Sequence, residues 1–179
     1  MTKIGIFYGS NTGNTEESAE AMEKALANVP GATVEVLEIS GTTVGKIPDY
    51  DKLIFGIPTW YVGEIQEDWD AVLPELKEMD LTGKQVAIFG HGDMYGYPDT
   101  YQDAIGIVGE ICLEIGTDLV GWWSTDGYEY DESIAEVDGM FMGLSLDDHQ
   151  TELHDERIEQ WIQQLIVEFA LQPEVVAGS

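Results

Sequence analysis

Short apolar runs alternate along this chain with segments whose apolar residues recur at helical spacing. The apolar runs cover residues 3–8, 33–37, 52–57 and 84–89, and a fifth begins at 118–123. Helical spacing is found in residues 19–29, 69–76, 104–115 and 158–169. Strands that are apolar on both sides are typical of a parallel sheet covered by helices on its two faces. We therefore predict an α/β fold, a doubly wound five-stranded parallel sheet in three α/β/α layers.

The length of 179 residues suits one domain, which we expect to span residues 1–179. Residues 124–148 break the alternation and contain several Gly and acidic residues. A connection of this length indicates an insertion in the fifth strand, with short strands of its own. We expect residues 172–179 to be frayed.

The chain is strongly acidic. It has 35 Asp and Glu against 7 Lys and Arg, a formal net charge of -28. Such a surface repels nucleic acid and anionic membranes, and it attracts basic protein partners. A saline habitat would also favour this composition.

Residues 1–20 do not resemble a signal peptide, and no apolar stretch approaches the roughly 20 residues of a membrane span. Cys112 is the single cysteine, so it forms no internal disulfide, which fits a reducing compartment. We expect a cytoplasmic protein that is not inserted in a membrane, and a monomer.

The predicted sheet also predicts where a ligand binds. In open parallel sheets, ligands lie beyond the carboxyl ends of the strands. The segments that follow strands one, three, four and five are residues 9–15, 58–64, 90–97 and 123–128. These segments are rich in Gly, hydroxyl groups and large aromatic side chains, so we expect them to form one site.

The first of these segments, GSNTGNT at 9–15, has the features of a phosphate loop without a positive charge. Its glycines permit tight turns that direct N–H groups inward, and the helix that follows adds a partial positive charge. It lacks the Lys of a nucleoside-triphosphate loop, the glycine spacing of a dinucleotide loop and the Cys of a phosphatase. The segment therefore indicates retention of a phosphate monoester by neutral donors, although an ordinary helix cap has a similar composition.

Large aromatic residues follow the third and fourth strands, at Trp60 and Tyr97. Such side chains can enclose a planar ring by stacking, or they can simply pack over the core. A phosphate at one end of a site and a flat ring at the other describe flavin mononucleotide (FMN).

With these segments in view, the chain resembles the flavodoxins, in particular the long-chain class of cyanobacterial and enteric types. The resemblance covers residues 3–170 and rests on GSNTGNT (9–15), PTWYVGE (58–64), FGHGDMYGYPDTYQDAIG (89–106), WSTDGYEY (123–130) and FMGLSLDD (141–148). It implies non-covalently bound FMN, strand order 2-1-3-4-5 and electron transfer without a substrate of its own.

The resemblance also implies roles for individual residues. Trp60 would cover the inner face of the flavin ring and Tyr97 the outer face, while the backbone of Tyr61 and Val62 would meet N5 and O4. Asp147 would contact the ribityl hydroxyls. Apart from the resemblance, His91 lies in a Gly-rich segment and is a candidate reporter of pH near the flavin. The full set of expected cofactor-binding residues is Ser10, Asn11, Thr12, Gly13, Asn14, Thr15, Pro58, Thr59, Trp60, Tyr61, Val62, Gly63, Gly90, His91, Gly92, Asp93, Tyr97 and Asp147.

We expect an electron carrier of low potential, because acidic surroundings disfavour the negative charge that full reduction leaves at N1. We also expect the Tyr61 peptide to turn on one-electron reduction, which would bring Tyr61 to a positive φ. Expected partners are basic redox proteins, such as a ferredoxin/flavodoxin–NADP reductase, photosystem I or a nitrogenase-type acceptor. The alternative is an FMN-dependent NAD(P)H quinone or nitro reductase, which would need an open ring face. We expect no catalytic residue and no metal site.

Overall fold

The computed structural model describes residues 1–171, so the frayed end predicted for 172–179 lies outside the described residues. Its main sheet has the parallel order β2-β1-β3-β6-β11. β7 pairs with the same edge of β6 as β11 does, but with the first residues of β6 instead of the last. The strands are β1 (Thr2–Tyr8), β2 (Ala32–Glu38), β3 (Lys52–Gly56), β6 (Gln85–Gly92), β7 (Asp118–Val120) and β11 (Leu144–Asp147). The predicted order 2-1-3-4-5 is therefore confirmed.

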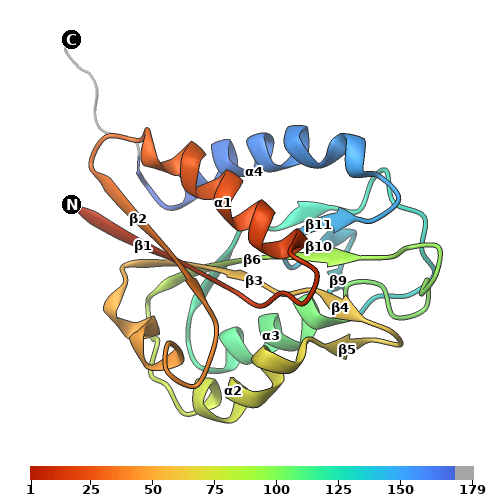
Figure 1. Ribbon diagram of the computed structural model, residues 1–179, viewed down its shortest axis with the longest axis horizontal. Coiled ribbons are helices and arrows are strands. Elements are labelled where there is room, and N and C mark those ends of the chain that lie inside the picture. Colours follow the sequence, from red (N-terminus) through yellow and green to blue (C-terminus); the bar gives the residue numbers. More distant parts are fainter. Residues whose placement is uncertain (172–179) are drawn as a thin grey trace.

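Helices cover both faces of this sheet. In Figure 1, α1 (Asn14–Ala27) and α4 (His154–Glu168) lie above it, and α2 (Glu67–Lys77) and α3 (Asp103–Glu114) lie below it. Two 3₁₀ segments, η1 (Val44–Asp49) and η2 (Thr151–Leu153), complete the helical elements of the described residues. The three-layer prediction is confirmed.

The apolar runs explain why the protein has two hydrophobic cores, one on each face of the sheet. Side chains alternate along a strand, so a strand between two helical layers must be apolar at successive positions. In β1, Ile4 and Ile6 pack with α1 and α4, whereas Phe7 packs with α2 and α3. Gly5 has no room for a side chain, because a Cβ there would lie 2.7 Å from the Tyr50 ring.

The fifth strand is divided in two by the predicted insertion. β7 pairs with Gln85–Ala87 of β6, and β11 pairs with Phe89–Gly92 of the same strand. Between them, β8 (Trp123–Ser124), β10 (Met140–Phe141) and β9 (Glu136–Val137) form a small antiparallel sheet. The insertion ends earlier than the predicted 148, because residues 144–147 return to the main sheet.

The sequence-based end of the fourth strand at residue 89 is wrong by three residues. β6 continues to Gly92 because β11 supplies a pairing partner for Phe89–Gly92. Gly90 and His91 therefore lie in the sheet, where the sequence predicted a loop. This continuation carries the His91 side chain into the layer between the sheet and α1.

Aromatic packing attaches the insertion to the main domain core. Tyr101, two residues before α3, stacks on Tyr130 with ring centroids 5.2 Å apart. Phe141 packs against Tyr101, Tyr128 and Tyr130. Arg157 of α4 lies over the Tyr128 ring, 4.4 Å from its centroid.

No helix within the described residues is long and apolar enough to cross a membrane.

Exposed carboxylates crowd the neighbouring helices α1 and α4. Glu17 and Glu20 project from α1, and Asp155 and Glu159 from α4, with a shallow groove between the two helices. Within residues 1–171 the one side-chain ion pair closer than 4.0 Å joins His149 to Asp93. Among the described residues, the carboxylates of this helical layer therefore have no Lys or Arg partner within 4.0 Å.

This unpaired charge predicts that salt stabilises the fold. Raising NaCl from about 0.05 M to about 1 M shortens the screening length to about 3 Å and should raise the free energy of unfolding in chemical denaturation. At low salt, Glu159→Gln should stabilise by about 0.2–0.5 kcal/mol by removing like-charge repulsion, and the matched variant Gln160→Glu should destabilise similarly. Stability that is unchanged or lower in salt would contradict this account.

Candidate functional site

A cleft opens at the carboxyl edge of the sheet, where the sequence predicted it. Three predicted segments form its walls: residues 9–15 after β1, residues 58–64 after β3 and the segment that follows β6. The lining residues are Thr12, Asn14, Thr15, Pro58, Thr59, Trp60, Tyr61, His91, Asp93, Tyr97 and Asp148. Ten of these eleven residues belong to the expected set, and Asp148 is the one that sequence reasoning missed.

The other expected residues lie behind the cleft or beside it. Val62 is exposed at the tip of the turn between β4 (Thr59–Trp60) and β5 (Glu64–Ile65), and Asn11 borders a neighbouring hollow with Trp60. The remaining residues that do not line the cleft are Ser10, Gly13, Gly63, Gly90, Gly92 and Asp147. Residues 123–128, which the sequence also placed at the site, do not line the cleft and instead support the strands behind it.

The loop of residues 9–15, the predicted phosphate loop, leaves the N-terminus of α1 open. Gly13 adopts φ 90°, in the left-handed region that favours Gly, and its N–H donates to Ser10 Oγ at 2.9 Å. No side chain caps α1. The first N–H groups of a helix have no partner within the helix, so those that follow Gly13 are available to an anion.

Neighbouring side chains hold this loop in place. Gln66 donates to Asn11 Oδ1 at 3.1 Å, and its own amide oxygen accepts the Trp69 N–H at the start of α2. Tyr8 donates its hydroxyl to Glu16 in the first turn of α1. Burial and the carboxylate of Glu16 raise the pKa of Tyr8 to about 12, so its hydroxyl remains a donor at neutral pH. Gln66 carries no sequence signal, because its role depends on two segments that are distant in the chain.

Trp60 and Tyr97 border the cleft from β4 and from the loop after β6. Trp60 is partly buried, and its Nε1 is buried without a hydrogen-bond partner among the described residues. Tyr97 is 37 % exposed and Tyr61 59 % exposed, so aromatic surface reaches solvent beside the opening. A flat ring between these walls would exclude water from both.

The turn between β4 and β5 is strained at Tyr61. Tyr61 has φ 46°, and its carbonyl accepts the Gly63 N–H at 3.0 Å. A bulky residue in the left-handed region costs free energy that surrounding contacts must offset. The expectation that Tyr61 reaches a positive φ only on reduction does not hold in this structure, because the turn already has that geometry.

Two aspartates organise the loops after β6 and β11. Asp147 is fully buried, and its two carboxylate oxygens accept the N–H groups of Met94 and His149, each at 2.7 Å. Its predicted contact with ribityl hydroxyls remains a prediction, and the structure adds a role in holding the loops together. Although burial raises the pKa of Asp93, the Gly96 N–H and His149 have the larger combined effect and hold it below its ordinary value.

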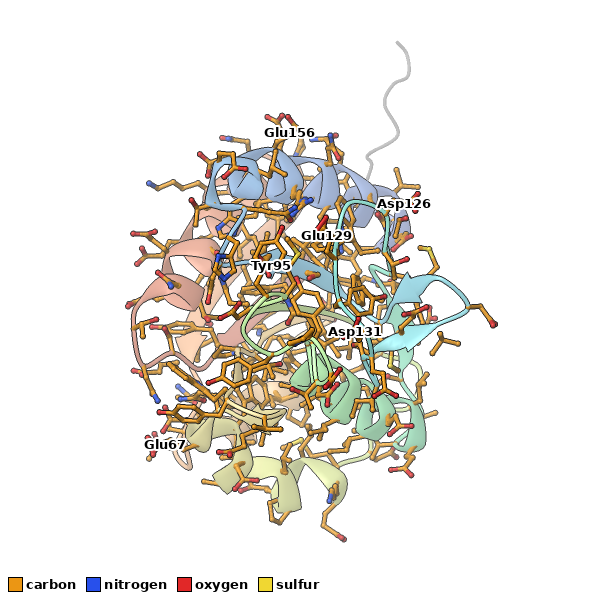
Figure 2. All side chains as sticks on the ribbon, turned by 90° about the vertical axis from the view of Figure 1, so that its right-hand side faces the viewer. Glu67, Tyr95, Asp126, Glu129, Asp131 and Glu156 are labelled. Carbon is orange, nitrogen blue, oxygen red and sulfur yellow. The ribbon has the colours of Figure 1, made fainter. Side chains whose placement is uncertain are left out.

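Carboxylates surround this end of the molecule. Figure 2 faces the side that lies at the right of Figure 1, where the central strands end. Tyr95, which is 56 % exposed, lies near the middle of this face. The exposed acidic residues labelled around it are Glu67, Asp126, Glu129, Asp131 and Glu156. Among the described residues, no group of three or more His, Cys, Asp or Glu side chains has a geometry that could hold a metal ion.

Comparison with known proteins places these features in one family. Residues 6–161 match the family model described as flavodoxin. The chain is 45 % identical to a flavodoxin of Picosynechococcus sp. over 172 residues, covering 96 % of this chain and 100 % of that protein. It is also 45 % identical to a flavodoxin of Haemophilus influenzae, covering 96 % and 98 % of the two chains. A crystal structure of Fusobacterium nucleatum flavodoxin bound to flavin mononucleotide superposes with a TM-score of 0.88 at 32 % identity, covering 94 % and 99 %.

The strain at Tyr61 predicts an unusual preference for glycine. Tyr61→Gly should be more stable than Tyr61→Ala by about 1 kcal/mol, because only Gly adopts this φ without strain. The exposed neighbour Val62 is not among the residues with positive φ. At this position Val62→Gly should instead be less stable than Val62→Ala. Denaturant unfolding of the four variants measures both differences, and the same order at the two positions would contradict a strained Tyr61.

Proposed function

The chain belongs to the flavodoxin family, and on that premise we propose that the cleft at the carboxyl edge of the sheet is where it holds FMN. The protein is an electron carrier that uses FMN, not an enzyme. The observation that best supports this location is the meeting of two features in one cleft: the uncapped N-terminus of α1 and the aromatic side chains of Trp60 and Tyr97. FMN, when bound, supplies the redox chemistry.

The residues present fit such a group. Within residues 1–171, three buried side-chain atoms lack a hydrogen-bond partner, and two of them, Trp60 Nε1 and His91 Nδ1, belong to residues that line the cleft. Buried polar atoms are nearly always partnered, so these two are expected to meet a ligand. The third, Gln102 Oε1, lies behind β6, where its amide nitrogen donates to Gly90 and Ser145.

We assign the phosphate end of the cleft to residues 10–15 and the ring end to Pro58, Thr59 and the aromatic walls. Trp60 would cover the inner ring face and Tyr97 the outer one, while the Tyr61–Val62 backbone would meet N5 and O4. The backbone N–H groups near Gly92 and Asp93 would meet the N3, O2 and N1 edge, and Asp147 would hold the loops on either side. The cleft is lined by Asp93 and Asp148 and by no Lys or Arg, so its residues disfavour added negative charge at N1. This environment supports a low potential.

This proposal predicts a yellow protein that binds FMN and does not react directly with pyridine nucleotides. The FMN-free protein should quench the fluorescence of added FMN, and the loaded protein should show flavin absorption that bleaches on stepwise chemical reduction. NADH or NADPH alone should reduce it slowly, and adding a flavoprotein reductase should accelerate reduction. A colourless preparation that ignores FMN would contradict the cofactor site, and rapid reduction by NAD(P)H alone would favour a quinone or nitro reductase.

We further propose that the acidic face in Figure 2 is where redox partners dock. Partners of the expected kinds, a ferredoxin/flavodoxin–NADP reductase, photosystem I or a nitrogenase-type acceptor, would present basic surfaces to it. Opposite charges steer association and raise its rate at low ionic strength. Exposed aromatic residues at the opening, including Tyr61 and Tyr95, provide contact area near the flavin edge.

Docking at this face predicts rate effects that depend on position. The second-order rate of reduction by a basic reductase should fall with increasing salt, because screening removes the steering. At low salt, Glu67→Gln combined with Asp126→Asn should lower this rate by roughly threefold, a small part of the 10- to 1000-fold range that steering spans. The control combines Glu78→Gln and Glu114→Gln, which change exposed residues at the opposite edge of the sheet. Equal effects of the two double variants would exclude specific docking here.

We also propose that residues 1–171 fold as one domain in the cytoplasm. Two apolar cores share the central sheet, and the aromatic cluster attaches the insertion to one of them. Cys112 is buried, and burial raises the pKa of its thiol to about 12, which suits an unreactive core position. A single cooperative unfolding transition and recovery of the protein in the soluble cell fraction test these two statements.

A further inference from the structure

His91 occupies an unusual position for a histidine. It is the penultimate residue of β6 and is only 6 % exposed, between α1 and α4. Its Nε2 lies 2.9 Å from the Ser18 hydroxyl on α1. Its ring meets that of His154 edge to face, with centroids 5.4 Å apart. His154 is itself fixed, because its Nε2 lies 2.7 Å from the carbonyl oxygen of Asp147.

The two ring nitrogens of His91 have different surroundings. His91 borders the cleft together with Thr12, Asn14 and Thr15, and it also borders a smaller hollow that contains Ser18 and His154. Ser18 borders only the smaller hollow, and it engages Nε2. Nδ1 is buried and has no partner among the described residues. The ring thus borders both spaces, and because Ser18 engages Nε2, Nδ1 is the nitrogen that still lacks a partner.

The charge of His91 follows from its burial. Burial, with a smaller contribution from His154, lowers the pKa of His91 to about 3, so the imidazole is neutral at neutral pH. The titratable groups that border the same two spaces are His154 from α4, the carboxylates of Glu17, Asp93, Asp148 and Asp155, and the phenols of Tyr61 and Tyr97. A neutral imidazole has one donor and one acceptor nitrogen. The partner of each nitrogen therefore decides which of them carries the proton.

We propose that His91 is a phosphate ligand of the FMN site that donates Nδ1–H as a neutral imidazole, while the Ser18 hydroxyl donates to Nε2. This assignment rests on the proposed FMN site and adds to it a ligand from β6, outside the loop of residues 10–15. Only the tautomer with the proton on Nδ1 can donate a hydrogen bond to the phosphate. The tautomer with the proton on Nε2 would direct the lone pair of Nδ1 at an anion, which is repulsive. Ser18 acts as a positioning residue, since its hydroxyl can donate to Nε2 and so leave the proton on Nδ1.

The chain offers a matched pair of substitutions for this test. The side-chain amide of Asn lies near the position of a histidine Nδ1, whereas that of Gln reaches the position of Nε2. His91→Asn therefore keeps a donor for the phosphate and loses the contact with Ser18, and His91→Gln does the reverse. Riboflavin, which lacks the phosphate, is the matched ligand for FMN.

Fluorescence titration of the FMN-free protein with both flavins gives the result. His91→Gln should raise the Kd for FMN by roughly tenfold to a hundredfold, as expected for loss of a hydrogen bond to a charged acceptor. It should leave the Kd for riboflavin nearly unchanged, and His91→Asn should weaken FMN binding much less. Equal losses for the two flavins, or equal effects of the two substitutions, would overturn the role of His91 and leave the FMN site intact. Binding of neither flavin by the unsubstituted protein would overturn both.

A measurement on the unsubstituted protein keeps the proposal testable if the variants do not fold. Nitrogen-15 NMR of histidine-labelled protein distinguishes Nδ1–H, Nε2–H and the doubly protonated ring. With FMN bound at neutral pH, His91 should show protonated Nδ1 and unprotonated Nε2, and Ser18→Ala should lower the share of that tautomer. An Nε2–H or doubly protonated His91 in the FMN-bound protein would overturn the proposal.

Discussion

Pairing along both edges of β6 is the constraint on which the cleft depends. β3 pairs with one edge, and the two halves of the divided fifth strand pair with the other. Because β11 extends that pairing to Gly92, the end of β6 is held as a strand up to the start of the next loop. Asp147, paired with Gly92 in β11, then fixes the loop after β6 by accepting the Met94 N–H. The position of every residue that β6 brings to the cleft follows from this arrangement, and the insertion is tolerated because it leaves the pairing intact.

Most of the fold could be predicted from local sequence patterns. For the site, the sequence predicted which loops form it, but not the contacts of most individual residues within it. Continuous apolar runs predicted the main strands because burial on both faces leaves that pattern in the sequence. The end of β6 was missed because Gly90-His91-Gly92 has the composition of a loop, and its strand geometry depends on β11, more than fifty residues later in the chain. Gln66 and Asp148 were missed for the same reason, since their roles come from contacts that bring distant segments together. The tight turn of residues 9–15 and its place at the cleft were predictable because the glycines and neutral donors that specify them are adjacent in the sequence, and its phosphate-binding role stays a prediction.

An acidic protein that binds an anionic ligand must keep most of its carboxylates away from the charged group of that ligand. The described structure does this with backbone N–H groups at the start of α1 and neutral side chains in residues 10–15, while carboxylates lie elsewhere in the cleft, at Asp93 and Asp148, and on the surface around it. Glu16, in the first turn of α1, accepts a hydrogen bond from Tyr8, which gives one carboxylate near the phosphate loop a fixed partner. Neutral donors hold a phosphate without cancelling its charge, so the local potential stays negative. On the proposed function, the negative local potential that would favour a low redox potential would also attract basic partners.

The buried nitrogens of Trp60 and His91 connect stability with ligand binding. Each is an unpartnered polar atom in a residue that lines the cleft, one beside the aromatic walls and one beside the phosphate loop. An unmade buried hydrogen bond costs about 1–3 kcal/mol, and a protein can retain such atoms when a ligand satisfies them in the working state. Their positions beside the two halves of the cleft match a ligand with a flat ring at one end and an anionic group at the other. If FMN binds in the cleft as proposed, this arrangement would favour the whole molecule over either fragment, because only the complete molecule would meet both groups at once.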